Sequence, residues 1–150
     1  MYSATHEITV DASIERIVQF LETPRSHRKV VPGLLALETV RPVEDEAWRG
    51  QYVYKLAGVQ LEGTIRTVNC ELPTAMDLEL SGAIDGEVRV RFDMADGEGV
   101  TIAVRVEYDL PETILAAVPE ATATAYVRRE LECTLGNLKT HLAAIGAGSD

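Results

Sequence analysis

The stretch that decides the fold is VRRELECTLGNLKTHLAAIG, residues 127–146, close to the end of the chain. Its apolar residues recur at intervals of three or four, which is the spacing of one face of an α-helix. They are Val127, Leu131, Leu135, Leu138, Leu142 and Ile145. Gly146 lies where a C-cap glycine is expected. A helix of this length has to bury its apolar stripe against a large apolar surface.

Strand-like runs that precede the helix supply this surface. About seven are expected, over residues 6–10, 35–39, 48–56, 64–72, 76–80, 87–94 and 100–110. The last two alternate most cleanly, which is typical of an antiparallel hairpin with one apolar face and one charged face. The apolar face of the first of them consists of Val88, Val90, Phe92 and Met94. The run over 64–72 shows no clear alternation, so its phase stays open.

Two short helices are predicted after the first strand. The first begins after Asp11 or Ser13, either of which can cap it, and ends at Thr23-Pro24 because a residue before proline is disfavoured in a helix. The second covers Ser26–Val31. A linker over residues 111–119 is expected before the final helix. The apolar face of the first helix consists of Ile14, Ile17, Val18 and Leu21.

Length and charge narrow the functional classes. With 150 residues, the chain is expected to form one domain over residues 1–150 with its own core. Its net charge of -10 repels phosphate groups, so nucleic acid and anionic membranes are expected to be poor partners. The sequence has neither a basic and apolar leader nor an apolar run of about 20 residues. We therefore expect a cytoplasmic protein that does not insert into membranes.

No set of residues has the spacing of a catalytic or metal site. His6, His27 and His141 all lie more than four residues from one another and from any cysteine, so we expect surface or structural histidines. Cys133 lies in the middle of the final helix and is expected to be a core residue rather than a nucleophile. The sequence predicts no catalytic residue, metal or cofactor, and it leaves enzymatic activity undecided.

The aromatic residues are the main candidates for a binding site. If the strands alternate as described, Trp48, Tyr52 and Tyr54 point to the same inner face as the aromatic residues of the last two strands. They are interpreted either as core packing or as the wall of an apolar pocket with tyrosine hydroxyls as polar contacts. Arg66 is either a surface residue or, if it points inward, a contact for an anionic group. The candidate ligand-binding residues are Trp48, Tyr52, Tyr54, Arg66, Met76, Phe92, Tyr108 and Tyr126.

Several short motifs occur in an order that is typical of one superfamily. ITVDAS, residues 8–13, runs into the first helix, and VPG, residues 31–33, follows. GVTI, residues 99–102, opens a strand that ends with EYDLP, residues 107–111, and NLK, residues 137–139, lies in the final helix. With these motifs the chain resembles the START-like, or SRPBCC, superfamily and its Bet v 1-like helix-grip fold. The resemblance implies a central cavity that binds lipids, sterols, quinones, polyketides or plant hormones, with catalysis in only some members.

Two subgroups of the superfamily are similar to this chain. One is the polyketide cyclase/dehydrase-like group, and the other surrounds an accessory protein of carbon monoxide dehydrogenase. VPGL, residues 31–34, and LAGV, residues 56–59, leading into EGT, residues 62–64, suggest the second group. That group commonly carries an extra C-terminal segment for membrane attachment. Because the sequence ends at Asp150 without one, recruitment to a membrane is not expected.

We therefore expect an α+β helix-grip domain, in which an antiparallel sheet of about seven strands wraps around the long C-terminal helix. Its expected function is non-catalytic binding of a small, largely apolar ligand such as a lipid, quinone or polyketide. The alternatives are a cyclase/dehydratase-type enzyme on a polyketide-like substrate and an accessory protein for a partner enzyme, as in the carbon monoxide dehydrogenase group. An enzyme would place a titratable side chain in the pocket, whereas an accessory protein would show an exposed apolar patch and a small or filled cavity. The ligand, the pathway and the oligomeric state stay open, with a homodimer as one option.

Overall fold

The computed structural model describes residues 2–22, 27, 30–42, 48–56, 58–71, 74–95 and 99–148 of the chain. Strands come first and the longest helix comes last, with one helix after the first strand and another after the last strand. In chain order the elements are β1 (Tyr2–Val10), α1 (Ile14–Glu22), β2 (Leu34–Pro42), β3 (Trp48–Leu56), β4 (Val59–Glu71), β5 (Ala75–Gly82), β6 (Asp85–Ala95), β7 (Gly99–Asp109), α2 (Glu112–Ala117) and α3 (Glu120–Gly148).

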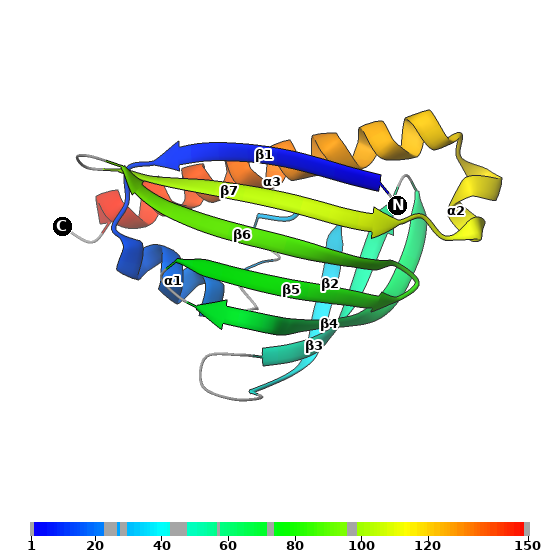
Figure 1. Cartoon of the computed structure of the whole chain (residues 1–150), viewed down its shortest axis with the longest axis horizontal. Helices are drawn as coiled ribbons and strands as arrows, with labels where there is room; N and C mark the ends of the chain where they lie inside the picture. Colours follow the sequence, from blue (N-terminus) through cyan, green and yellow to red (C-terminus); the bar gives the residue numbers. More distant parts are fainter. Residues whose placement is uncertain are drawn as a thin grey trace.

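The strands form one antiparallel sheet of seven in the order β1-β7-β6-β5-β4-β3-β2. Strands β2 to β7 neighbour one another in chain order, while β1 joins beside β7, with Tyr2 opposite Tyr108 and Val10 opposite Val100. The sheet is curved, and α3 runs along β1 at one edge and approaches β3 near the other (Figure 1). Helices α1 and α2 lie at opposite ends of α3. The prediction of an α+β helix-grip fold is confirmed.

Ser13, rather than Asp11, begins helix α1. The Ser13 carbonyl accepts hydrogen bonds from Arg16 N at 3.2 Å and Ile17 N at 3.3 Å, and its hydroxyl lies 3.4 Å from Arg16 N. The helix buries Ile17 and Phe20. The predicted apolar face omitted Phe20, whose ring stacks on that of His27 with centroids 5.5 Å apart. The side chain of Leu21, which was predicted to lie on that face, is outside the described residues.

Most of the second predicted short helix, over Ser26–Val31, lies outside the described residues. Within it, Val30 N and Val31 N donate to the carbonyl of His27 at 3.1 and 3.0 Å. The expected linker over residues 111–119 instead contains α2, which starts after Pro111. Ile114 fixes this short helix to the protein, because its side chain is fully buried.

Strand β4 contains a bulge, and this explains why its phase could not be read from the sequence. Leu61 and Ile65 face inward and Arg66 faces outward, but the pairing with β5 shifts between Thr67 and Asn69. The extra residue of a β-bulge interrupts the two-residue alternation of a strand. Here that residue is Val68, which is 45% exposed.

Met94 does not lie on the apolar face where the alternation predicted it. Its side chain is 64% exposed, although its partner Val100 on β7 is buried. The pairing of β5 with β6 ends at Ala75 and Arg91, so the end of β6 has a neighbouring strand on one side only. An apolar residue at such a corner lacks the flanking side chains that would cover it.

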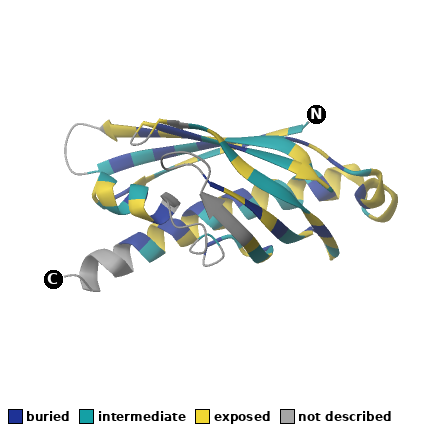
Figure 2. Cartoon of the chain, turned by 90° about the horizontal axis from the view of Figure 1, so that it is seen from below, coloured by how far each residue is buried: buried dark blue, intermediate teal, exposed yellow. Residues whose placement is uncertain are grey.

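Buried apolar residues form two clusters at opposite ends of the molecule. The larger contains residues of α1 and of the C-terminal part of α3, such as Ile17 and Leu142. The smaller contains Ile114 of α2 together with Leu56 and Tyr108. Buried and exposed positions alternate along the strands and along α3 (Figure 2). In α3 the leucines at 131, 135, 138 and 142 are at most 8% exposed, so the predicted stripe is confirmed at these positions.

Candidate functional site

A cavity of about 290 Å³ lies between the concave face of the sheet and α3. Its wall is formed by α1, by the segment between α1 and β2, by strands β2 to β7 and by the middle of α3. Its volume is at the lower end of the range for small-molecule sites. Residues of both apolar clusters contribute to its wall, so the cavity lies between them.

The wall of this cavity is almost entirely aliphatic and aromatic. Most of its residues are Val, Leu, Ile and Phe, and none of the described lining residues is a lysine or an arginine. A few side chains bring polar atoms to the wall. They are His27, Tyr52, Tyr54, Tyr108, Glu130 and Thr134.

Glu130 supplies the carboxylate of the cavity wall. It lies on α3, one residue before the buried Leu131, and it is half-buried. Its Oε1 accepts a hydrogen bond from the main-chain N–H of Gly33 at 2.5 Å. The carbonyl of Gly33 in turn accepts a hydrogen bond from Lys55 N at 2.8 Å. The turn before β2 is therefore fixed to both α3 and β3.

Position 33 requires glycine because of this close approach. A Cβ there would lie 2.8 Å from Glu130 Oε1 and 2.9 Å from both the Lys55 carbonyl oxygen and the Tyr54 ring. Any larger residue would push the turn away from the carboxylate. Nearby, Asn137 Nδ2 donates to the Val30 carbonyl at 3.0 Å and holds the same segment to α3.

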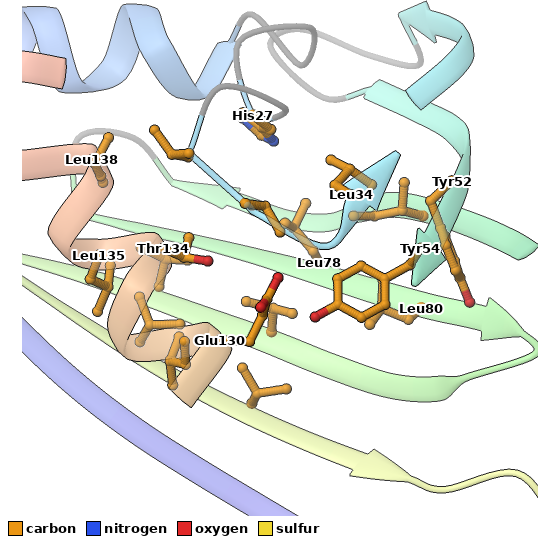
Figure 3. A pocket seen from close by; sticks show the side chains of 18 of the residues that line it. His27, Leu34, Tyr52, Tyr54, Leu78, Leu80, Glu130, Thr134, Leu135 and Leu138 are labelled. Atoms are coloured by element: carbon orange, nitrogen blue, oxygen red, sulfur yellow. The ribbon is translucent and has the colours of Figure 1, made fainter. Parts of the chain in front are cut away.

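Tyr54 points toward Glu130 from the opposite wall, and their oxygen atoms face each other across the cavity (Figure 3). Burial raises the pKa of the Tyr54 hydroxyl far above its ordinary value, and the negative charge of Glu130 and the hydrogen bond to it raise this pKa further. The phenol is therefore protonated at neutral pH, with its hydroxyl directed at the carboxylate. Glu130, Tyr54 and Gly33 form one connected polar group, which we call the carboxylate cluster.

Tyr52 also lines the cavity, but its hydroxyl is used by the main chain. It donates toward the carbonyls of Ser81 at 3.3 Å and Ile84 at 3.4 Å, and it accepts from Ile84 N at 3.3 Å. Its ring crosses Gly63, the residue opposite it on β4, where any Cβ would clash with the ring. Burial raises the pKa of Tyr52. Its role is therefore to shape the wall and fix the turn between β5 and β6.

The structure places four of the eight candidate residues at the cavity and four elsewhere. Those at the cavity are Tyr52, Tyr54, Phe92 and Tyr108. Tyr108 is buried, which raises its pKa, and its ring lies 5.7 Å from that of Tyr2. Whether these side chains contact a ligand stays a prediction.

Trp48, Met76 and Tyr126 belong to the packing around the cavity rather than to its wall. Trp48 is 3% exposed and meets the edge of the His27 ring at 5.5 Å. Met76 is 1% exposed within the larger cluster, and Tyr126 packs against the smaller one. Alternation along a strand identifies the inner face but cannot tell which part of that face is filled by side chains.

Arg66 lies outside the cavity, so it does not mark an inward site for an anion. Its side chain is 57% exposed on the outer face of the sheet and pairs with Glu79 on β5 at 2.9 Å. The cause is the strand phase before the bulge, which turns Ile65 inward and Arg66 outward. Cys133 is exposed, and the expectation of a core position was also wrong.

The sequence interpretation missed Glu130, Thr134 and the cavity position of His27. Glu130 and Thr134 lie three and seven residues after Val127, on the helical face that buries the leucines. The position of the Glu130 carboxylate within an apolar stripe could therefore have identified it from the sequence. Within the described parts of the chain, no group of His, Cys, Asp and Glu side chains is arranged to hold a metal ion. No helix among the described residues is both long and apolar enough to cross a membrane.

Comparison with known proteins agrees with this architecture. The family model for polyketide cyclases/dehydrases and lipid transport proteins matches residues 1–143. No curated protein matches the sequence. Among solved structures, TTHA0849 from Thermus thermophilus superposes with a TM-score of 0.81 at 16% identity, over 96% of this chain and 99% of that one.

Two further solved structures are similar. A START superfamily protein from Mycobacterium smegmatis has a TM-score of 0.75 at 14% identity, covering 97% of this chain and 99% of that one. The Zhui aromatase/cyclase from a Streptomyces species has a TM-score of 0.76 at 13% identity, covering 95% and 93%. At these identities the likeness shows the shared fold.

Proposed function

This chain belongs to the polyketide cyclase/dehydrase and lipid transport family of START-like proteins, and we propose that it binds one small, largely apolar molecule between its sheet and α3. The observation that carries the proposal is the apolar cavity of about 290 Å³ at the centre of the fold. The carboxylate cluster supports it, because ligand sites typically combine an apolar wall with a few placed polar groups.

The cavity leaves apolar wall that side chains do not cover. Its lining is almost entirely Val, Leu, Ile and Phe, and larger side chains at these positions would fill the space. Apolar surface that a ligand removes from water contributes about 25 cal/mol per Å². We infer that the space is kept for a ligand.

The test is to fill the cavity from one strand. Val88 lines it from β6, and the next residue, Arg89, points to solvent. We expect the parent to bind the neutral fluorescent probe N-phenyl-1-naphthylamine, with a rise in emission and a 1:1 endpoint. Val88→Trp should abolish this binding, whereas Arg89→Trp, with the same added side chain, should retain it. A probe that binds both variants equally would lie outside the cavity and contradict the proposal.

A second candidate function is acid–base catalysis of the cyclase/dehydratase kind. The specific observation that favours it is the Glu130 carboxylate facing the Tyr54 phenol inside an apolar cavity. A carboxylate with little water around it can remove a proton, and a positioned phenol can return one. The sequence analysis named an enzyme as an alternative but no catalytic residue. Glu130 is a candidate base for that alternative.

A generic proton-abstraction substrate tests this second candidate without knowledge of the natural one. Removal of the ring C–H proton of 5-nitrobenzisoxazole by a base breaks its N–O bond and releases a coloured phenolate. If Glu130 acts as a base, Glu130→Gln should lower the rate by about tenfold or more. Glu132→Gln changes the same charge on the exposed side of α3 and should leave the rate unchanged. Equal rates in all three proteins would remove catalysis by Glu130 from consideration.

The accessory-protein alternative receives less support. Its expected marks were an exposed apolar patch and a small or filled cavity. The large apolar side chains that are exposed among the described residues are Leu35, Val68, Met94 and Leu115, and they come from four different elements. The cavity is not filled by side chains. Binding of a small molecule therefore fits the geometry better than docking of a partner enzyme.

A further inference from the structure

We propose that the ligand presents a hydrogen-bond donor, such as a hydroxyl, phenol or amine group, to Glu130 and Tyr54, and that the cavity rejects carboxylic acids and other anions. This inference rests on the proposed function, because it names the chemical class of molecule that the cavity binds. It narrows the ligand from any apolar molecule to a neutral or cationic one with a donor group at one end.

Both polar hydrogens of the carboxylate cluster are directed at Glu130. The N–H of Gly33 donates to Glu130 Oε1 at 2.5 Å, and the hydroxyl of Tyr54 faces the same carboxylate (Figure 3). A carboxylate has two oxygens with about four acceptor positions, so acceptor capacity remains after both bonds. What the cluster offers to the cavity is therefore lone pairs on Glu130 and on the phenol oxygen. A ligand group that donates a hydrogen bond can use this capacity.

Elsewhere on the wall the polar side chains are His27, Tyr52, Tyr108 and Thr134, none of which carries a permanent positive charge. The Tyr52 hydroxyl is bonded to the main chain of Ser81 and Ile84. No lysine or arginine is among the described lining residues, and Arg66 is paired with Glu79 on the outer face of the sheet. An anion in the cavity would lose its hydration, gain no lysine or arginine as a partner and lie near the Glu130 carboxylate. The geometry therefore disfavours fatty acids and other carboxylates.

Three naphthalene derivatives that differ in one polar group test the proposal by displacement of N-phenyl-1-naphthylamine. They are 1-naphthol, 1-methoxynaphthalene and 1-naphthoate at pH 7.5. A hydrogen bond to a charged group accounts for about a tenfold or larger difference in affinity. We expect 1-naphthol to bind about tenfold or more tightly than 1-methoxynaphthalene, which cannot donate, and 1-naphthoate to bind most weakly.

Variants then test whether the preference for 1-naphthol depends on the carboxylate cluster. In Glu130→Gln the amide both donates and accepts, so the affinities of 1-naphthol and 1-methoxynaphthalene should come within about threefold and 1-naphthoate should bind more tightly. Glu132→Gln removes the same charge from the exposed side of α3. This control should keep the full preference. Thermal unfolding of each variant confirms that it is folded.

The outcomes separate this inference from the function on which it rests. If the parent binds all three compounds with similar affinity, or binds 1-naphthoate most tightly, cavity binding stands and the donor rule is wrong. If the preference for 1-naphthol survives in Glu130→Gln, the polar contact lies elsewhere and the proposal is overturned. If neither the fluorescent probe nor any naphthalene binds to the parent, the proposed function itself fails.

Discussion

The carboxylate of Glu130 is held by a main-chain N–H rather than by a cation. The hydrogen bond from Gly33 is charge-assisted, and such bonds are stronger than neutral ones. It leaves the carboxylate negative and directed into the cavity, where a paired arginine would have neutralised it. Gly33 is therefore as much a part of the site as the residues that line it.

Replacing Gly33 by alanine should disrupt this contact. The new Cβ would lie 2.8 Å from Glu130 Oε1, so the turn or the carboxylate has to move. We expect a loss of about 1–3 kcal/mol in the free energy of unfolding and weaker binding of N-phenyl-1-naphthylamine. Gly136→Ala is the matched control, because a Cβ at this helical position meets nothing within 4 Å and should stabilise α3 by up to about 1 kcal/mol. Equal stability of the two variants in urea denaturation would contradict the close approach.

The buried tyrosines predict a loss of stability in alkali. Burial raises the pKa of Tyr52, Tyr54 and Tyr108, and Glu130 adds to the effect at Tyr54. A pKa that is higher in the folded than in the unfolded chain means that the stabilisation is intact below the unfolded pKa of about 10 and is lost as the pH rises above it. The free energy of unfolding should fall between about pH 10 and 11.5. It should fall less steeply with pH in Tyr54→Phe, as measured by urea denaturation at each pH. If the free energies of unfolding of the parent and of Tyr54→Phe fall in parallel with pH, the pKa of Tyr54 is not raised by folding.

At the scale of elements, α3 packs over the concave face of the sheet. Leu131 and Leu138 lie in the larger cluster and also line the cavity. Truncation of a buried leucine to alanine costs about 2–5 kcal/mol, so Leu131→Ala with Leu138→Ala should nearly unfold the protein. Glu132→Ala with Lys139→Ala changes exposed neighbours and should melt near the parent temperature. If the two double variants melt within a few degrees of each other by circular dichroism, α3 is peripheral and the account of the core is wrong.

The sequence predicted those elements whose alternation is uninterrupted. On β3, Trp48 and Tyr52 are buried and Arg49 and Gln51 are exposed, as the two-residue period requires. On β4 the bulge at Val68 breaks the period, so the faces of its residues could not be assigned. Helix α2 escaped notice because its six residues are too short to show a helical period.

The candidate site was harder to predict than the fold. The inner face of the sheet could be read from alternation, and this identified four residues of the cavity wall, Tyr52, Tyr54, Phe92 and Tyr108. Side chains fill one part of that face and leave a cavity over another. Which part is filled depends on how α1, α3 and the turn at Gly33 pack against the sheet and against one another. These contacts join residues about 100 positions apart, as from Gly33 to Glu130, and one sequence does not specify them.

At the scale of the whole molecule, the paired charged side chains lie on the outer face of the sheet and the apolar cavity lies on its concave face. Arginines of the outer face pair with carboxylates, as in Arg66–Glu79 and Arg91–Asp77. The Arg91 guanidinium holds the pKa of Asp77 below its ordinary value. Exposed pairs of this kind contribute little to stability, but they cover the convex face of the sheet with balanced charge. The net charge of -10 is expected to disfavour polyanionic partners, and the concave face contains the apolar cavity.

The central claim is that a small molecule binds inside the fold rather than on its surface. Nuclear Overhauser contacts between 1-naphthol and the labelled leucine and valine methyl groups of the protein test it most directly. We predict contacts to Leu78, Val104 and Leu135, which line the cavity from β5, β7 and α3. Contacts only to exposed methyl groups such as those of Leu35 and Leu115, or none at saturating 1-naphthol, would contradict the claim.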